Sequence, residues 1–432
     1  MQTFGGSRLE INILNQNYLK TNELKTLNAS FIPMKPTSQY FNEDHDLFRQ
    51  SVRQFIEKEV VPHTEKWETE RKIPKEIFAR MGDLGFLGLA LPETYGGSNA
   101  DFWFTVVFLE ELARCGMGGF ATAVSVHQYM AINHLAKIGS EDLKQKYLVP
   151  AIAGQKLAAL GISEPNTGSD VSAITTTAIK DGDEYVVNGS KTFISNGTYG
   201  DFITLTVKTN PSAAQPQNGI SLLLVDLDSA GVTRTKLNKM GWHSSDTAEI
   251  KFDDVRVPAT NLIGMENMGF YYLMESLQLE RLVAGIMAVA GSAWAMDETI
   301  KYLHEREAFG RPIGKFQAIR HKMADVATEI EVAREFVYST CWKHAQGEVV
   351  VKQCSMAKLF TAEMQKRVVD TCLQFFGGYG YIEDYPICRA YRDVRVGTIA
   401  GGTSEIMREI ISKIVLDAVG YKAVYKGEQV AV

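Results

Sequence analysis

The chain has 432 residues, enough for two or three domains of roughly 100–200 residues each, and 45% of its residues are hydrophobic. Charged residues make up 22%, and the net charge is −6. Because nucleic-acid-binding proteins normally carry a basic face, this balance disfavours that class of function, and we expect no nucleic-acid partner.

The first 40 residues are predicted to be a poorly ordered extension. They lack the apolar core of a signal peptide, and with Glu10, Glu23 and a single arginine they fit a mitochondrial transit peptide poorly. No apolar run approaches the roughly 20 residues that a membrane helix needs, so we expect no integral membrane segment.

Three regions with different periodicity follow the extension. Residues 41–155 space their apolar side chains at three and four, as in DLFRQSVRQFIEKEVV, which predicts helices. Residues 156–265 contain short runs rich in Val, Ile and Thr, such as DFITLTVKT and ISLLLVDLD, with no helix between them, which predicts a largely antiparallel β-domain. Residues 266–420 return to long helical patterns typical of a four-helix bundle, and residues 421–432 form a tail.

The cysteines and histidines indicate neither disulfides nor a metal site. The five cysteines are far apart, none forms a C-x-x-C pair, and we expect reduced, mostly packed thiols. The eight histidines lack metal-type spacing, so we expect no metal. The cysteines are Cys115, Cys341, Cys354, Cys372 and Cys388.

Two segments of the β-domain are candidates for contact with a planar or phosphorylated ligand. Residues 160–171 (LGISEPNTGSDV) combine glycines with small hydroxyls, which suit a polar ring edge or a phosphate, although an ordinary loop is the alternative. In residues 188–197 (NGSKTFISNG), two Asn-Gly turns are expected to bracket a strand with Phe193 and Ser195 on one face. Phe193 is placed to stack on a cofactor, and a plain hairpin is the alternative.

Two segments of the C-terminal region are glycine-rich. Residues 306–314 (REAFGRPIG) lie between two predicted helices, and Arg306 suits a diphosphate, although a solvated loop is the alternative. Residues 374–381 (QFFGGYGY) follow a helix, whereas the dinucleotide fingerprint needs a strand before its glycines. A Rossmann domain is therefore disfavoured.

Glu280 interrupts the apolar face of a long predicted helix. On a wheel of about 100° per residue, seven apolar or small residues fall within about 60° of it. Burial would raise the pKa of this carboxyl and make it a candidate base near neutral pH. The alternative is a structural glutamate paired with Arg281 or another buried cation. The seven residues are Leu273, Ser276, Leu277, Val283, Ala284, Met287 and Gly291.

The stretch TIAGGTSEIM (residues 398–407) is expected to be a turn leading into a helix, with free backbone N–H groups for a ligand. It contains neither a nucleophile nor an obvious base.

These segments together resemble the acyl-CoA dehydrogenase family, most closely its long-chain type and bacterial relatives. The resemblance runs from about Phe41 to Leu416, and its motifs occur in family order. They are GISEPNTGSD, KTFISNG, MGWHSSDTAEIKFDDVRVP, REAFGRPIGKFQ, QFFGGYGYIEDYP and AGGTSEI.

The resemblance implies an α+β multidomain fold: an N-terminal helical domain, a middle antiparallel β-domain and a C-terminal four-helix bundle. It implies a homotetramer, a dimer of dimers, that holds FAD non-covalently and partly across a subunit interface. The implied reaction converts a fatty acyl-CoA, medium or long and straight, into the trans-2-enoyl-CoA and passes electrons to electron-transfer flavoprotein. The implied compartment is the cytoplasm of a bacterium, which we favour, or a mitochondrial matrix.

The resemblance also implies site residues. Those beside the flavin or its phosphates and adenosine would be Leu160, Gly161, Ile162, Ser163, Glu164, Pro165, Asn166, Thr167, Gly168, Ser169, Phe193, Ile194, Ser195, Arg306, Phe309, Gln317, Gln374, Phe375, Phe376, Gly377, Gly378, Thr403, Ser404 and Glu405. Those near the substrate would be Ser169, Gln217, Asn218, Tyr271, Gln278, Leu279, Glu280, Arg281, Gly401 and Gly402.

One position departs from the commoner family pattern. Many members carry the catalytic base as a Glu where this chain has Gly401, whereas a minority, including long-chain and isovaleryl types, carry it where this chain has Glu280. We therefore expect Glu280 to be the base, and the Gly401 N–H, with the FAD ribityl 2′-hydroxyl, to hold the thioester oxygen. The alternatives are a branched short-chain (isovaleryl-like) substrate, a flavin oxidase or monooxygenase, and a non-catalytic flavin/CoA-binding relative.

Overall fold

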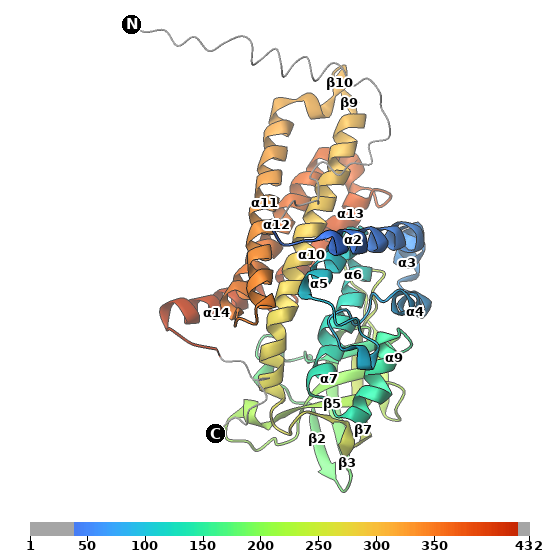
Figure 1. The fold of residues 1–432 in the computed structure, drawn as a ribbon, viewed down its shortest axis with the longest axis vertical. Coiled ribbons are helices and arrows are strands. Elements are labelled where there is room, and N and C mark those ends of the chain that lie inside the picture. The colour runs from blue at the N-terminus through green and yellow to red at the C-terminus, as the bar shows by residue number, and fades with distance from the viewer. Residues whose placement is uncertain (1–38, 422–432) are drawn as a thin grey trace. The chain divides into compact units, whose positions relative to one another are not determined.

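The computed structural model describes residues 39–421, so the expected N-terminal extension and C-terminal tail lie almost entirely outside the described residues. Within the described part, a set of short helices comes first, a β-sheet follows, and long helices complete the chain (Figure 1). This order agrees with the predicted three-part fold. Helix starts follow local chemistry: Asn42 forms a capping box with His45 at the start of α2, and the Asp101 side chain accepts the Trp103 N–H at the start of α5.

The N-terminal helices are interrupted by three π-helical segments, at Ile56–Val60, Val126–Ala131 and Lys144–Leu148. Such segments redirect side chains within an otherwise continuous helical path. The helices are α2 Glu43–Phe55, α3 Thr64–Glu70, α4 Lys75–Asp83, α5 Phe102–Ala113, α6 Gly118–Ser125, α7 Ile132–Ile138, α8 Glu141–Leu143 and α9 Val149–Ile152.

The middle sheet has the strand order β6-β7-β3-β2-β4-β5-β8, with β1 paired to β4. The prediction of a largely antiparallel sheet is confirmed, and only the pairings of β4 with β1 and β2 are parallel. The strands are β1 Ala158–Gly161, β2 Thr177–Asp181, β3 Glu184–Ser195, β4 Phe202–Lys208, β5 Ile220–Asp226, β6 Val232–Lys236, β7 Thr247–Pro258 and β8 Leu262–Ile263.

One of the two predicted Asn-Gly turns in this region is wrong. Asn188 and Gly189 lie inside β3, where the pairing with β7 shifts register between Val187 and Gly189. Gly189 has φ +143°, and a Cβ there would lie 2.6 Å from the Thr176 hydroxyl. The glycine therefore marks a β-bulge and a close backbone approach. Asn196, with φ 61°, does begin a turn as expected.

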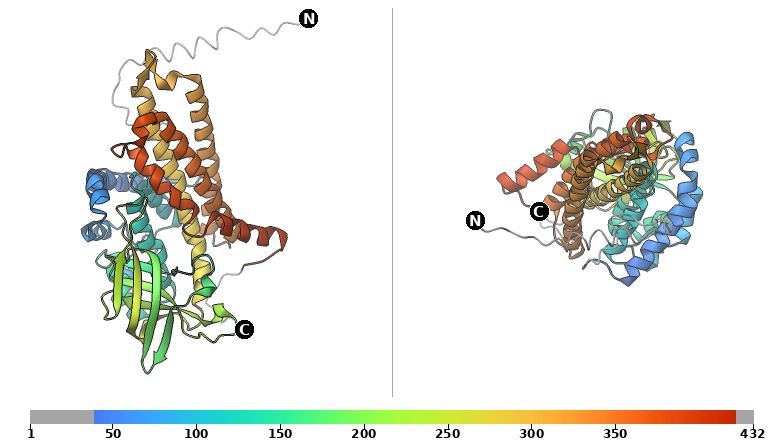
Figure 2. Two further views of the ribbon diagram at one scale, coloured as in Figure 1. Left: turned by 180° about the vertical axis from the view of Figure 1, so that it is seen from behind. Right: turned by 90° about the horizontal axis from the view of Figure 1, so that it is seen from above.

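The C-terminal domain is built on three long helices that pack on one another, α10 Gly269–Glu305, α11 Gln317–Ala345 and α12 Val351–Phe376. Helices α13 Pro386–Val394 and α14 Ser404–Leu416 pack against α12. The segment between α10 and α11 forms a small hairpin, β9 Glu307–Ala308 with β10 Arg311–Pro312, a structure that the sequence pattern did not predict between the two helices. Figure 2 shows α14 extending away from the long helices.

Helix α10 corrects the expectation about apolar runs. It is long and apolar enough to cross a membrane by length and composition, but 72% of its apolar window is buried. Three helices pack against α10: α5 from the N-terminal region, and α11 and α12 from the C-terminal region. Helix α10 is therefore a helix of the protein core. The five cysteines are free thiols, and four of them are buried.

Candidate active site

A mostly apolar cavity of about 190 Å³ lies where α10, α12, the α5–α6 region and the turn before α14 meet. Five separate stretches of sequence supply its walls, and Glu280 and Gly401 both line it. The lining side chains of α10 repeat at three- and four-residue intervals, because one helix face looks into the cavity. The α10 members are Glu280, Val283, Ala284, Met287, Ala288, Gly291 and Trp294.

Glu280 is a buried carboxyl that forms no ion pair with the residues that the structure describes. Glu280 is 6% exposed, and its Oε1 atom has no hydrogen-bond partner. Burial raises the pKa of Glu280 to about 7, and the charge of Arg281 and a hydrogen bond with Ser276 oppose this only in part. Within residues 39–421, no ion pair joins Glu280 to a cation, which weighs against the structural alternative of a paired glutamate.

The turn that contains Gly401 is held from α12. Gly401 and Gly402 have φ angles of +66° and +91°, a conformation that glycine adopts without strain. The ammonium of Lys358, a residue only 2% exposed, donates a hydrogen bond to the Gly402 carbonyl and also lines the cavity. Burial lowers the pKa of Lys358 to about 8. Lys358 therefore connects the turn to α12, which also lines the cavity that contains Glu280.

The loop at residues 160–169 is built around an internal ion pair. Lys191 Nζ lies 2.8 Å from Glu164 Oε1, and both side chains are buried. Burial alone would raise the pKa of Glu164, but the Lys191 charge and donors from Thr175 and Thr176 outweigh it and hold the pKa at about 2. The Glu164 carboxylate is thus fully engaged inside the protein, where it shapes the loop. Residues 165, 166, 168 and 169 are exposed.

Phe193 stands out from the sheet at an irregular point of β3. It has φ 61° and is 72% exposed, while the neighbouring Ile194 is buried and Ser195 is half-buried. The register of β3 against β7 shifts between Lys191 and Ile194. A bulge of this kind re-aims a side chain, and here it presents a large ring to the outside of the fold. The Thr192 N–H donates to the Ser163 carbonyl, which ties this strand to the loop at residues 160–169.

Most of the remaining residues that the family resemblance assigned to FAD line one of two separate pockets. Arg306 lines a pocket of about 500 Å³ with residues 374–378. Thr403, Ser404 and Glu405 line a different one, of about 740 Å³, which carries Lys366, Arg367 and Arg395. Phe309 is 94% exposed in the β9–β10 hairpin, and Gln317 is exposed at the start of α11; neither lines these pockets.

The expected substrate residues are brought together only in part. The Tyr271 hydroxyl donates to Asn218 Oδ1 at 2.8 Å, which joins the start of α10 to the loop before β5. Gln217 bonds within that loop, to Gln215. Gln278, Leu279 and Arg281 lie on other faces of α10 than the cavity face, and Ser169 is exposed in its loop.

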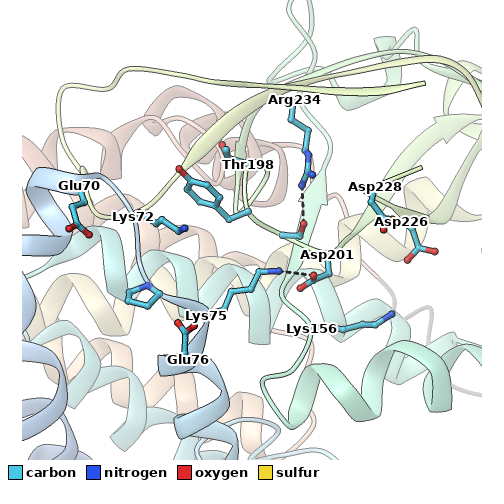
Figure 3. A pocket seen from close by; sticks show the side chains of 13 residues that line it. Glu70, Lys72, Lys75, Glu76, Lys156, Thr198, Asp201, Asp226, Asp228 and Arg234 are labelled. Carbon is cyan, nitrogen blue, oxygen red and sulfur yellow. Dashed lines mark hydrogen bonds and ion pairs between the residues drawn. The ribbon is translucent and has the colours of Figure 1, made fainter. Parts of the chain in front are cut away.

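Two features of the structure had no counterpart in the sequence reasoning. Lys358, Gln365, Trp294 and Asp393 line the cavity, but no spacing links them to Glu280, because they meet it only through tertiary packing. A polar groove of about 660 Å³ lies between the N-terminal helices and the sheet, with Lys75 Nζ 2.6 Å from Asp201 (Figure 3). Its lysines and carboxylates offset one another, so it has no clear preference for ligand charge.

Comparison with known proteins places this arrangement in a family. Residues 42–155, 159–255 and 267–416 match the N-terminal, middle and C-terminal domains of acyl-CoA dehydrogenases. The long-chain specific acyl-CoA dehydrogenase of Sus scrofa mitochondria is 40% identical over 376 residues, 86% of each chain.

Two further relatives are also acyl-CoA dehydrogenases. The isovaleryl-CoA dehydrogenase of Pongo abelii is 37% identical over 387 residues, 89% of this chain and 91% of that one. The crystal structure of acyl-CoA dehydrogenase from Geobacillus kaustophilus superposes with a TM-score of 0.86 at 44% identity, covering 88% of this chain and 100% of that chain. The chain therefore belongs to the acyl-CoA dehydrogenase family of flavin-dependent oxidoreductases.

Proposed function

We propose that the chain oxidises medium- or long-chain straight acyl-CoA thioesters to trans-2-enoyl-CoA, with Glu280 as the base that removes the α-proton. The observation that carries the proposal is the buried Glu280 carboxyl, whose Oε1 has no hydrogen-bond partner, in the same apolar cavity as Gly401. A general base works best when its pKa lies near the working pH, and burial brings that of Glu280 to about 7.

The second requirement is to hold the thioester oxygen, because the α-proton becomes acidic enough only when charge on that oxygen is stabilised. Gly401 is the candidate donor through its N–H, and its missing side chain leaves room for the thioester. Lys358 is a positioning residue for this donor, because its hydrogen bond to the Gly402 carbonyl holds the Gly402–Thr403 peptide group in the same turn as Gly401. A single donor of this kind contributes about 2.7–4 kcal/mol to lowering a barrier.

The described residues fit FAD, the cofactor of this family. Ser404 Oγ is buried without a partner at the N-terminus of α14, where an anion is favoured. A Cβ added at Gly377 or Gly378 would meet nothing within 4 Å, so a ligand can approach that backbone beside Arg306. FAD, when bound, supplies the acceptor for the hydride that leaves the β-carbon. The separation of the two pockets supports a cofactor shared between subunits of a homotetramer.

The length of the cavity supports a long, straight acyl chain over a short branched one. Glu280 and Trp294 are fourteen positions apart on α10 and both line the cavity, which corresponds to about 21 Å along the helix. The acyl chains of one bilayer leaflet occupy about 15 Å, half of a hydrocarbon core of about 30 Å. A branched short acyl group would leave most of such a cavity unused, although the isovaleryl relative keeps that substrate as the second candidate.

Two finer points are part of the proposal. Electron-transfer flavoprotein is the proposed electron acceptor. The relatives include mitochondrial and bacterial proteins, and we propose a bacterial cytoplasmic setting for this chain.

The test is an anaerobic titration of the purified holoprotein with butyryl-, octanoyl-, palmitoyl- and isovaleryl-CoA. We expect the yellow flavin spectrum to bleach, fastest with the long straight chains. Bleaching with isovaleryl-CoA alone would favour the branched substrate. No bleaching with any thioester would overturn the proposed activity in favour of a non-catalytic binding protein.

A further inference from the structure

The cavity face of α10 continues well beyond the proposed base. Val283 and Ala284 line the cavity one turn after Glu280, and Gly291 and Trp294 line it three and four turns after. Helices α5 and α12 both pack against α10 (Figure 1), and Ala113 at the end of α5 and Gln365 of α12 line the cavity. The deep part of the cavity therefore lies between three rigid helices, so single side chains there decide how far a ligand reaches.

Gly291 lines the cavity opposite the flexible side chain of Gln365 from α12. A Cβ at this position would come within 2.8 Å of Gln365 Nε2, and Gln365 lines the cavity from the α12 side. A glycine inside a helix costs about 1 kcal/mol relative to alanine. At Gly291 the missing side chain keeps a passage open between the two helices, and the local helix preference does not explain it.

Trp294 lies one turn further along and packs on backbone. A Cβ at Gly116 would come within 2.4 Å of the Trp294 ring, so the ring lies directly against the α5–α6 connection. Gly116 has φ +68°, which any side chain would adopt only with strain. The ring thus bridges α10 and the α5–α6 connection where both line the cavity.

We propose that Gly291 and Trp294 determine the acyl-chain length that the protein accepts. Gly291 keeps open the passage to the deep part of the cavity, and Trp294 forms its end wall. The end of a long acyl chain lies beyond Gly291 and stops at the Trp294 ring. This inference rests on the proposed function, because it assigns residues to the acyl end of the same substrate.

The main test is Gly291→Leu in the FAD-loaded protein, assayed with palmitoyl-CoA and butyryl-CoA. One methylene in an apolar pocket changes specificity by about 10–200-fold. We therefore expect the ratio of kcat/KM for palmitoyl-CoA over butyryl-CoA to fall at least about tenfold. Trp294→Ala should instead raise the ratio of kcat/KM for acyl-CoAs longer than palmitoyl-CoA over butyryl-CoA, because it removes the end wall.

The matched control is Gly285→Ala, compared with Gly291→Ala. Gly285 is also inside α10 but does not line the cavity, and its added Cβ would lie at ordinary contact, 3.7 Å from Ala357, Thr361 and Val337 side-chain atoms. We expect Gly285→Ala to leave the chain-length ratio unchanged and Gly291→Ala to lower it. FAD content and the thermal midpoint are measured for each variant.

The outcomes separate the inference from the function on which it rests. If the wild-type protein oxidises no acyl-CoA, the proposed function fails. If it does, and Gly291→Leu retains FAD with an unchanged ratio, the chain-length assignment is overturned while the function stands. Should Gly291→Leu lose FAD, Gly291→Ala and Trp294→Ala decide, and unchanged ratios in both would equally overturn it.

Discussion

Replacing Glu280 by glutamine tests the proposed base with little change in shape. Gln has nearly the same volume, so the cavity face of α10 stays packed, but the amide cannot take a proton from the substrate. A positioned general base contributes about 10²–10⁴-fold to a rate. We expect flavin reduction by acyl-CoA to slow by at least about 100-fold in Glu280→Gln while FAD stays bound.

The same variant should be more stable than the wild-type protein at high pH. The ordinary pKa of Glu is 4.5, and burial raises that of Glu280 to about 7, so folding takes up a proton between these values. The wild-type fold therefore loses stability as pH rises from about 4.5, and the full loss is present above about 7. A pKa shift of this size corresponds to roughly 3 kcal/mol in the free energy of unfolding, and Glu280→Gln would recover this loss.

The assay combines stopped-flow flavin reduction with thermal midpoints at pH 5 and pH 8.5. Glu298→Gln is the control on the same helix: it removes a carboxylate that pairs with Lys301 at 2.6 Å and lies outside the cavity. We expect this control to keep the reduction rate and to change stability by less than about 1 kcal/mol. Near wild-type flavin reduction in Glu280→Gln would refute the assignment of the base.

Three further outcomes follow from the site. In Glu280→Gln, adding Gly401→Glu should recover part of the turnover, because a Cβ at Gly401 meets nothing within 4 Å. The backbone at φ +66° costs a non-glycine residue about 1–2 kcal/mol. No recovery would argue against the view that positions 280 and 401 both face the α-carbon of the substrate. In the wild-type protein kcat/KM should rise about tenfold per pH unit below 7 and level off above it; a flat profile would contradict a base with that pKa. Lys358→Met should slow flavin reduction at least about tenfold with FAD retained, because it removes the donor to the Gly402 carbonyl. Lys358→Arg keeps a donor and should recover part of the rate. Equal rates in all three proteins would show that Lys358 has no positioning role.

The helical wheel correctly grouped the residues around Glu280 that line the cavity, but it did not predict where along α10 this face stops lining the cavity. Val283, Ala284, Met287 and Gly291 do line the cavity with Glu280. Leu273, from the same stripe, is buried in the core between the sheet and the N-terminal helices. Period 3.6 places residues on a face, but α10 is packed on several sides, and only tertiary contacts decide which partner each turn of the helix meets.

The errors came from backbone irregularities and from contacts between distant segments. The dipeptide Asn188-Gly189 has the composition of a turn, yet the long pairing of β3 with β7 outweighs the local preference and leaves a bulge. The sequence also did not show that the Glu164 carboxylate pairs inside the protein with Lys191, twenty-seven residues later. Nothing in the spacing of the sequence links Lys358 to Gly402, because the contact depends on how α12 packs beside the turn.

The proposed position of the base on α10 would separate two tasks that conflict in one residue. A base needs a fixed, desolvated carboxyl, and Glu280 has one because its helix is packed on several sides. A backbone donor to the thioester oxygen needs a turn shaped by its peptide groups, and Gly401 has the left-handed φ that only glycine adopts without strain. A glutamate at Gly401 would have to serve both tasks from a strained residue. Burial on α10 raises the pKa of Glu280, while a contact from another helix, the Lys358 hydrogen bond to the Gly402 carbonyl, holds the turn.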